Sequence, residues 1–176
     1  MSTASLWDAL SSRWQPGLAV PVSQGGALRS HGQAGTVLLV DDEPLVLEVM
    51  AEALEELGWS LILCGDAGEG LGALSLLLGP AVLVVDVSLR GVSGPALADA
   101  FRDRRPDGAV VFTSGIGDGE ALVGAMRERD ALLRKPFGGR ELRRAVARAA
   151  TLATAARAER AGHMAARGAL ALMSAR

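Results

Sequence analysis

The sequence has no tyrosine, only one lysine and only one cysteine among its 176 residues. Cys64 alone cannot form an intrachain disulfide, and its apolar neighbours are typical of a small buried side chain in a reducing compartment. The longest apolar run, residues 74–85, is broken by Gly79 and Pro80 and is too short to span a bilayer. Charged side chains near the N-terminus do not fit a signal peptide. These absences exclude a disulfide scaffold and a membrane-spanning protein, and they predict a cytoplasmic location.

The net charge of −2 is unevenly distributed along the chain. Residues 36–139 carry a net charge of −9, whereas residues 140–176 carry +6 because they hold eight arginines and two glutamates. The first 35 residues are rich in Ser, Gly and Gln and show no sustained hydrophobic period. The chain is therefore predicted to have three parts: a flexible arm at 1–35, one domain at 36–150, and an Ala- and Arg-rich helical extension at 151–176.

From residue 36 onward, apolar segments alternate with amphipathic ones. Runs of Val, Ile and Leu predict five strands, at residues 36–40, 59–64, 81–86, 108–114 and 131–135. Apolar residues at helical spacing predict five helices, at residues 44–57, 67–78, 93–105, 120–129 and 139–150. Strands alternating with helices predict an α/β fold, a doubly wound parallel sheet with helices on both faces.

Polar side chains end several of these strands: Asp41, Asp42, Asp86, Thr113 and Lys135. In a doubly wound sheet, ligands bind beyond the carboxyl ends of the strands, so these groups are expected to converge. Three carboxylates held close together repel one another, and a hard divalent cation relieves that repulsion. Aspartates also end strands because they favour turns. Since three strand ends and the sole lysine agree, we predict a Mg²⁺ site, with Mn²⁺ as an alternative ion.

A carboxylate beside Mg²⁺ can attack a phosphoryl donor and form an aspartyl phosphate. Such a transfer depends on positioning and on cations that neutralise the phosphoryl oxygens. Mg²⁺ and the ammonium of Lys135 are predicted to supply these cations, and the Thr113 hydroxyl can donate to a third oxygen. The pattern indicates phosphoryl transfer to an aspartate.

Four segments, VLLVDDEP, VLVVDVSLRGVSG, VVFTSG and LLRKPF, resemble in order the marker segments of the receiver domain of bacterial two-component response regulators. The resemblance covers about residues 36–150 and implies a flavodoxin-like sheet with strand order 2-1-3-4-5. It implies Asp86 as the phosphoacceptor and Thr113 as a switch hydroxyl, with Lys135 before a cis peptide bond to Pro136. It also implies the protein ligands of the metal, namely Asp41, Asp42, Asp86 and the backbone carbonyl of Ser88.

The resemblance further implies the partners. The phosphodonor would be a sensor histidine kinase or a histidine phosphotransfer protein, and the target would be a downstream protein. The chain would not be an enzyme beyond its own Mg²⁺-dependent phosphorylation and dephosphorylation. Residues 151–176 are too few for a DNA-binding or enzymatic domain, which predicts a stand-alone receiver. Their arginines favour a homodimer, or return of the tail onto the acidic domain, over nucleic-acid binding.

Two positions depart from the family pattern. Arg90, read most simply as an exposed side chain, stands where most receivers have a proline, and Leu132 stands where many have Tyr or Phe. Both support an alternative, a receiver-like interaction module that needs no phosphorylation. A Mg²⁺-dependent phosphohydrolase is a second alternative, although Ser88 occupies the place of its second acid–base aspartate. The signalling surface is expected around the fourth helix, the fifth strand and the fifth helix.

Overall fold

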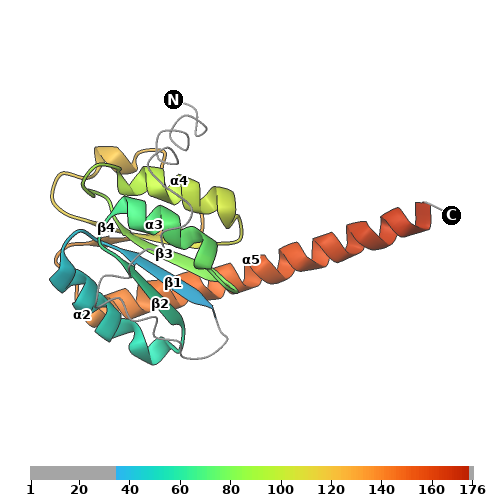
Figure 1. Cartoon of the computed structure of the whole chain (residues 1–176), viewed down its shortest axis with the longest axis horizontal. Helices are drawn as coiled ribbons and strands as arrows, with labels where there is room; N and C mark the ends of the chain where they lie inside the picture. Colours follow the sequence, from blue (N-terminus) through green and yellow to red (C-terminus); the bar gives the residue numbers. More distant parts are fainter. Residues whose placement is uncertain (1–34, 175–176) are drawn as a thin grey trace.

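The computed structural model describes residues 35–174, with side chains described as far as Arg167. The predicted flexible arm thus lies outside the described residues except for Gly35. The described chain forms one parallel sheet in the order β2-β1-β3-β4-β5, which confirms the predicted order (Figure 1). The strands are β1 (Thr36–Val40), β2 (Ser60–Cys64), β3 (Ala81–Asp86), β4 (Ala109–Ser114) and β5 (Ala131–Arg134).

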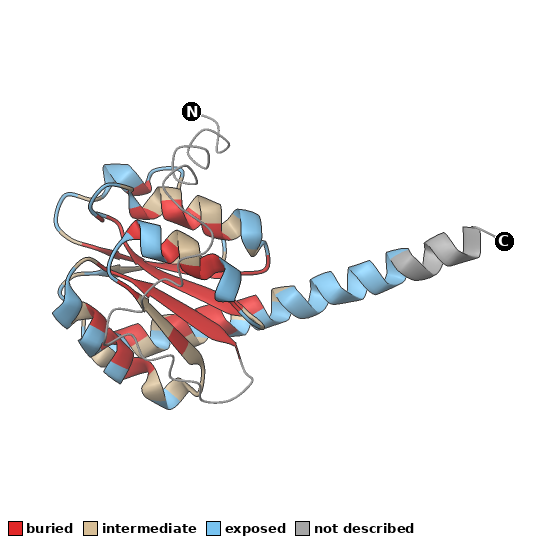
Figure 2. Ribbon diagram, in the orientation of Figure 1, coloured by how far each residue is buried: buried red, intermediate tan, exposed pale blue. Residues whose placement is uncertain are grey.

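Helices cover both faces of this sheet, as predicted. The α-helices within the described residues are α2 (Pro44–Leu54), α3 (Ala67–Ala73), α4 (Gly94–Arg104) and α5 (Gly139–Ser174). Successive side chains of a strand point to opposite faces, so the fully buried strands β1, β3 and β4 serve two cores. Leu83 and Phe112 lie in the core under α3 and α4, whereas Val84 and Val111 lie in the core under α2 and α5. The buried layer between the helices is visible in Figure 2.

The ends of the helices follow the local sequence. Pro44 occupies the first turn of α2, and the helix continues as a 3₁₀ turn, η1 (Glu55–Leu57), until Gly58 adopts a φ of 67°. The Ser93 hydroxyl caps α4 by accepting a hydrogen bond from the Ala96 amide at 3.4 Å. Three glycines shorten α3, which gives way to a 3₁₀ turn, η2 (Leu74–Leu76). The helix expected at 67–78 is therefore shorter than predicted.

The prediction of a helix at residues 120–129 is wrong. The structure has a single 3₁₀ turn there, η3 (Glu120–Leu122), followed by turns up to β5. Gly117 and Gly124 adopt φ values of 103° and 74°, which end helical geometry on both sides of η3. Leu122 is the one buried residue of the segment, and Val123 is 82% exposed, so no apolar face holds a helix against the sheet.

The last helix, α5, runs without interruption through Gly162 to Ser174, which is 36 residues. It is packed on the sheet as far as Ala153, its last fully buried residue within the described side chains, and beyond that it projects from the domain (Figure 1). The projecting part spans about 30 Å at 1.5 Å per residue. The tail therefore extends the last helix, as expected. None of the described helices combines the length and apolar character needed to cross a bilayer.

Candidate functional site

The polar strand ends meet at one edge of the sheet. Asp41 follows β1, Asp86 ends β3 directly beside Thr113 of β4, and Lys135 follows β5. Carboxylate oxygens of Asp41, Asp42 and Asp86 all lie within 4.8 Å of one another. The structure thus brings together the side chains that the sequence predicted to converge.

Lys135 joins two of these carboxylates. Its Nζ lies 2.9 Å from Asp41 Oδ2 and 3.1 Å from Asp86 Oδ2, and its side chain is 24% exposed. Its backbone amide donates to the Ser114 carbonyl at 2.7 Å, so the pairing of β4 with β5 positions the side chain. The peptide bond from Lys135 to Pro136 is cis, as the resemblance implied. The chain's one lysine is therefore built into the carboxylate cluster.

The pKa values of this pair reflect burial and mutual attraction. The pKa of Asp86 is raised, mainly because the carboxylate is buried and also because the charge of Asp41 is close. The hydrogen bond and charge of Lys135 and the Ser88 amide act in the opposite direction but do not outweigh burial. Burial works to lower the pKa of Lys135, but the hydrogen bonds and charges of Asp41 and then Asp86 outweigh it and raise that pKa. One ammonium therefore does not fully compensate the crowded carboxylates, and a second cation would stabilise their ionised form.

Asp86 Oδ1 and Thr113 Oγ1 are buried at this edge and have no hydrogen-bond partner among the residues that the structure describes. Leaving a buried polar atom without a hydrogen bond costs about 1–3 kcal/mol, so two such atoms in one place are uncommon unless they have a function. Carboxylate oxygens are the ligands that Mg²⁺ prefers, and Thr113 can donate to a phosphoryl oxygen. The residues present therefore fit a divalent cation together with a phosphoryl group.

Asp118 is a neighbour of the site that the sequence reasoning missed. Its carboxylate accepts hydrogen bonds from the Ser88 hydroxyl at 2.7 Å and from the Gly115 amide at 2.6 Å. It thus joins the loop after β3 to the loop after β4. The sequence does contain a signal for this contact, because Asp118 stands three residues after Gly115 in a glycine-rich segment. Aspartates in turns commonly accept hydrogen bonds from nearby backbone amides. The predicted role of the Ser88 carbonyl as a metal ligand stays a prediction.

Arg90 is exposed, as expected, but it is not isolated. Its Nε lies 2.6 Å from Asp42 Oδ2, and its terminal nitrogen donates to the Asp42 carbonyl at 3.4 Å. The hydrogen bond and charge of Asp42 raise the pKa of Arg90. A predicted metal ligand is therefore paired with a side-chain cation from the loop after β3.

Replacing Arg90 with alanine is expected to raise Mg²⁺ affinity about three-fold, because the cation no longer competes for Asp42 and an exposed ion pair is weak. Calorimetric titration of Mg²⁺ at constant ionic strength measures this change. Arg148→Ala, which removes an exposed arginine from α5, is the control for net charge and should leave the affinity unchanged. Unchanged or weaker Mg²⁺ binding in Arg90→Ala would contradict the competition.

A five-stranded doubly wound sheet with an acidic cluster and a lysine at its carboxyl edge defines the receiver class of α/β signalling domain. The family model for the response regulator receiver domain matches residues 37–147, and the chain belongs to that family.

Two curated relatives illustrate the similarity. The probable transcriptional regulatory protein TcrX of Mycobacterium tuberculosis is 32% identical over 65% of this chain and 49% of its own length. The tetrathionate response regulatory protein TtrR of Salmonella typhimurium is 34% identical over 71% of this chain and 61% of its own length. The chain thus spans roughly half to three fifths of these relatives, and they share the receiver part with it.

Solved structures agree with this assignment. A response regulator receiver domain protein from Clostridium thermocellum superposes with a TM-score of 0.59 at 26% identity, covering 66% of this chain and 94% of its own. The similarity supports the fold assigned to this chain.

Proposed function

We propose that this chain is a phosphorylatable receiver that accepts a phosphoryl group on Asp86 from a sensor histidine kinase or a histidine phosphotransfer protein. The observation that carries the proposal is the buried, unpartnered Asp86 Oδ1, whose sister oxygen is held by Lys135. The metal would be Mg²⁺, held by Asp41, Asp42, Asp86 and the Ser88 carbonyl. The chemistry is the protein's own modification, and no turnover of another substrate is proposed. We also propose that the protein is located in the cytoplasm.

The chain's residues divide the work of the transfer. Asp86 Oδ1 forms the new bond to phosphorus while the phosphorus–nitrogen bond of the donor phosphohistidine breaks and the imidazole leaves. Lys135 neutralises one phosphoryl oxygen and the Thr113 hydroxyl donates to another. Mg²⁺, when bound, supplies further charge neutralisation. Asp41 and Asp42 hold the negative charge that retains these cations, and water later hydrolyses the acyl phosphate.

The output of this receiver would be a change in its protein contacts. Thr113 leads through Ser114 directly into the segment at residues 115–130, which holds only the short turn η3. A segment with one buried apolar side chain is held weakly, so a small change at Thr113 can shift its population of conformations. We propose that this segment, β5 and α5 form the surface read by a downstream protein, with a homodimer through α5 as one form of that contact.

The proposal is tested by incubating the protein with a small-molecule phosphodonor and Mg²⁺ and measuring its intact mass. We expect an adduct of one phosphoryl group that is lost on chemical treatment that hydrolyses acyl phosphates. The adduct should be absent when a chelator removes the metal. An unmodified mass in the presence of Mg²⁺ and donor would overturn the proposal.

Lys135→Arg is expected to slow adduct formation about ten-fold, the effect of losing roughly one charge-assisted contact. The ammonium sits between Asp41 and Asp86 as a compact charge, whereas the planar guanidinium is too broad for that gap and pairs with one carboxylate at a time. The rate is measured by the time course of intact mass. Arg134→Lys, at the exposed neighbouring position, should keep the wild-type rate. An unchanged rate in Lys135→Arg would show that the lysine has no special role.

The Arg90–Asp42 ion pair favours one other function, a receiver-like interaction module that works without phosphorylation. In that case the arginine would serve as a permanent substitute for the metal charge. A partner-binding assay with wild type and Asp86→Asn distinguishes the two functions. The interaction module would bind its partner with the same affinity in both forms. A phosphorylatable receiver would change its partner affinity on addition of the phosphodonor in the wild type but not in Asp86→Asn.

A further inference from the structure

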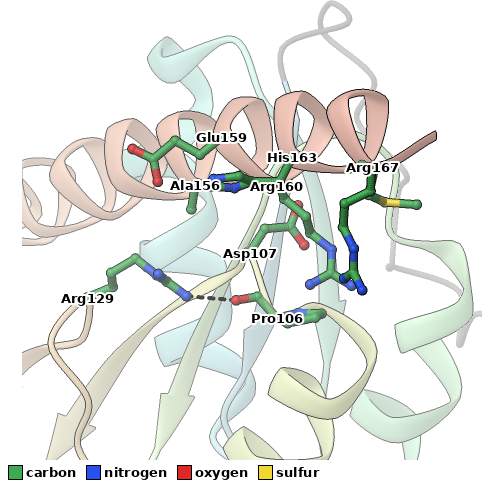
Figure 3. A pocket seen from close by; sticks show the side chains of 9 residues that line it. Pro106, Asp107, Arg129, Ala156, Glu159, Arg160, His163 and Arg167 are labelled. Atoms are coloured by element: carbon green, nitrogen blue, oxygen red, sulfur yellow. Dashed lines mark hydrogen bonds between the residues drawn. The ribbon is translucent and has the colours of Figure 1, made fainter. Parts of the chain in front are cut away.

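A groove of about 400 Å³ lies where α5 projects from the domain. One wall is α5 between Ala156 and Arg167, and the other is the turn at Pro106 and Asp107 together with Arg129 (Figure 3). This turn precedes β4 and Arg129 precedes β5, so the groove is at the amino ends of the strands. It is therefore at the opposite end of the sheet from Asp86.

Three guanidinium groups line the groove, those of Arg129, Arg160 and Arg167, together with the imidazole of His163. Arg129 donates to the Pro106 carbonyl at 2.7 Å. Arg160 and Arg167 make no hydrogen bond or ion pair with any other residue that the structure describes. Both side chains extend from α5 toward Pro106 (Figure 3). Two cations thus point into one groove without an anion to compensate them.

The acidic side chains of the groove do not supply that anion. Asp107 is buried and is paired with Arg157 at 3.2 Å. Arg105 adds positive charge nearby, and its guanidinium donates to the backbone carbonyls of Leu77 and Gly79. Burial lowers the pKa of Arg105; the charge of Asp107 opposes this shift and the charge of Arg157 adds to it. Glu159 is the remaining carboxylate of the lining, and it makes no ion pair with Arg160 or Arg167. The groove has an excess of positive charge.

We propose that this groove binds the oligophosphate group of a small molecule, such as a nucleoside di- or triphosphate. The planar guanidinium fork binds phosphate oxygens in pairs. Arg160 and Arg167 lie two turns apart on α5, and both side chains extend toward Pro106, so two guanidinium groups can bind the oxygens of linked phosphates in one ligand (Figure 3). Ala156, Met164 and Pro106 offer apolar surface for the rest of the ligand, and the volume lies in the range of small-molecule sites.

Isothermal titration with pyrophosphate and with ATP, in the presence of a chelator, tests this site on the full chain. We expect both to bind more tightly than inorganic phosphate, and the double variant Arg160→Glu/Arg167→Glu to weaken both at least about ten-fold. Both residues are exposed on α5, so the helix should persist in circular dichroism. Asp86→Asn should bind both probes like wild type, which separates this groove from the carboxylate cluster.

Arg144→Glu/Arg148→Glu is the matched control, because it also reverses two exposed charges on the same helix but lies outside the groove. It should reduce binding by less than about two-fold, as expected for screened distant charges. Equal losses in this control and in Arg160→Glu/Arg167→Glu would mean general attraction to a basic helix and would overturn the proposal. Absence of binding to either probe in the wild-type protein, or adenosine binding as tightly as ATP, would overturn it too.

Discussion

Asp86→Asn is expected to abolish the phosphoryl adduct completely. The carboxylate oxygen that would attack phosphorus is buried and unpartnered among the described residues. An amide at the same place is a far weaker nucleophile and lacks the charge that would hold the proposed metal. Burial and the charge of Asp41 both raise the pKa of Asp86, so the amide also removes an unfavourable buried charge. The variant should therefore remain folded while losing its modification, as measured by intact mass and circular dichroism.

Asp118→Asn is the informative control for this variant. Asp118 lies beside the site and accepts hydrogen bonds from Ser88 and Gly115, but it does not belong to the carboxylate cluster. It should retain the adduct, since no step of the transfer uses its carboxylate. A persistent adduct in Asp86→Asn, mapped to another residue, would place the acceptor elsewhere and contradict the proposed chemistry.

Gly94→Ala is expected to destabilise the domain by about 3 kcal/mol, the upper part of the range for overpacked cores. A Cβ at position 94 would lie 2.1 Å from the Asp86 carbonyl oxygen and 3.0 Å from the Val87 Cα, and both are backbone atoms that cannot turn aside. The Gly94 amide also donates to the Val87 carbonyl at 3.1 Å, which holds α4 close to β3. The start of α4 and the end of β3 would have to separate. Urea unfolding measures the loss of stability.

Gly119→Ala is the matched control for that substitution. A Cβ there meets no atom within 4 Å, and its φ of −58° suits any residue. It should leave the free energy of unfolding unchanged, or raise it by about 0.4–1 kcal/mol because alanine lowers the conformational entropy of the unfolded chain. If Gly94→Ala proved as stable as Gly119→Ala, the close approach of α4 to Asp86 would not be a constraint.

Local sequence was enough for the parts of the fold that depend on periodicity. Continuous apolar runs predicted β1, β3 and β4, because a parallel strand buried on both faces needs apolar side chains at every position. Ser93 and Pro95 predicted the start of α4, since capping is a contact between near neighbours. A helix was predicted at residues 120–129 because Leu122, Val123 and Met126 follow helical spacing. The segment is not a helix because glycines with positive φ interrupt it and because it has no buried apolar face.

The amino-acid sequence by itself determined the class of sheet, the strand ends that carry the polar groups and the set of carboxylates with one lysine. These are properties of short segments and of the rule that parallel strands end at one edge. Only the tertiary structure decided that Arg90 pairs with Asp42, that Asp118 joins Ser88 to Gly115, and that α5 places Arg160 and Arg167 over the turn before β4. The contacts of Arg90 with Asp42 and of Asp118 with Ser88 join residues 48 and 30 positions apart. No local pattern encodes such contacts, because they depend on how loops and a projecting helix pack in space.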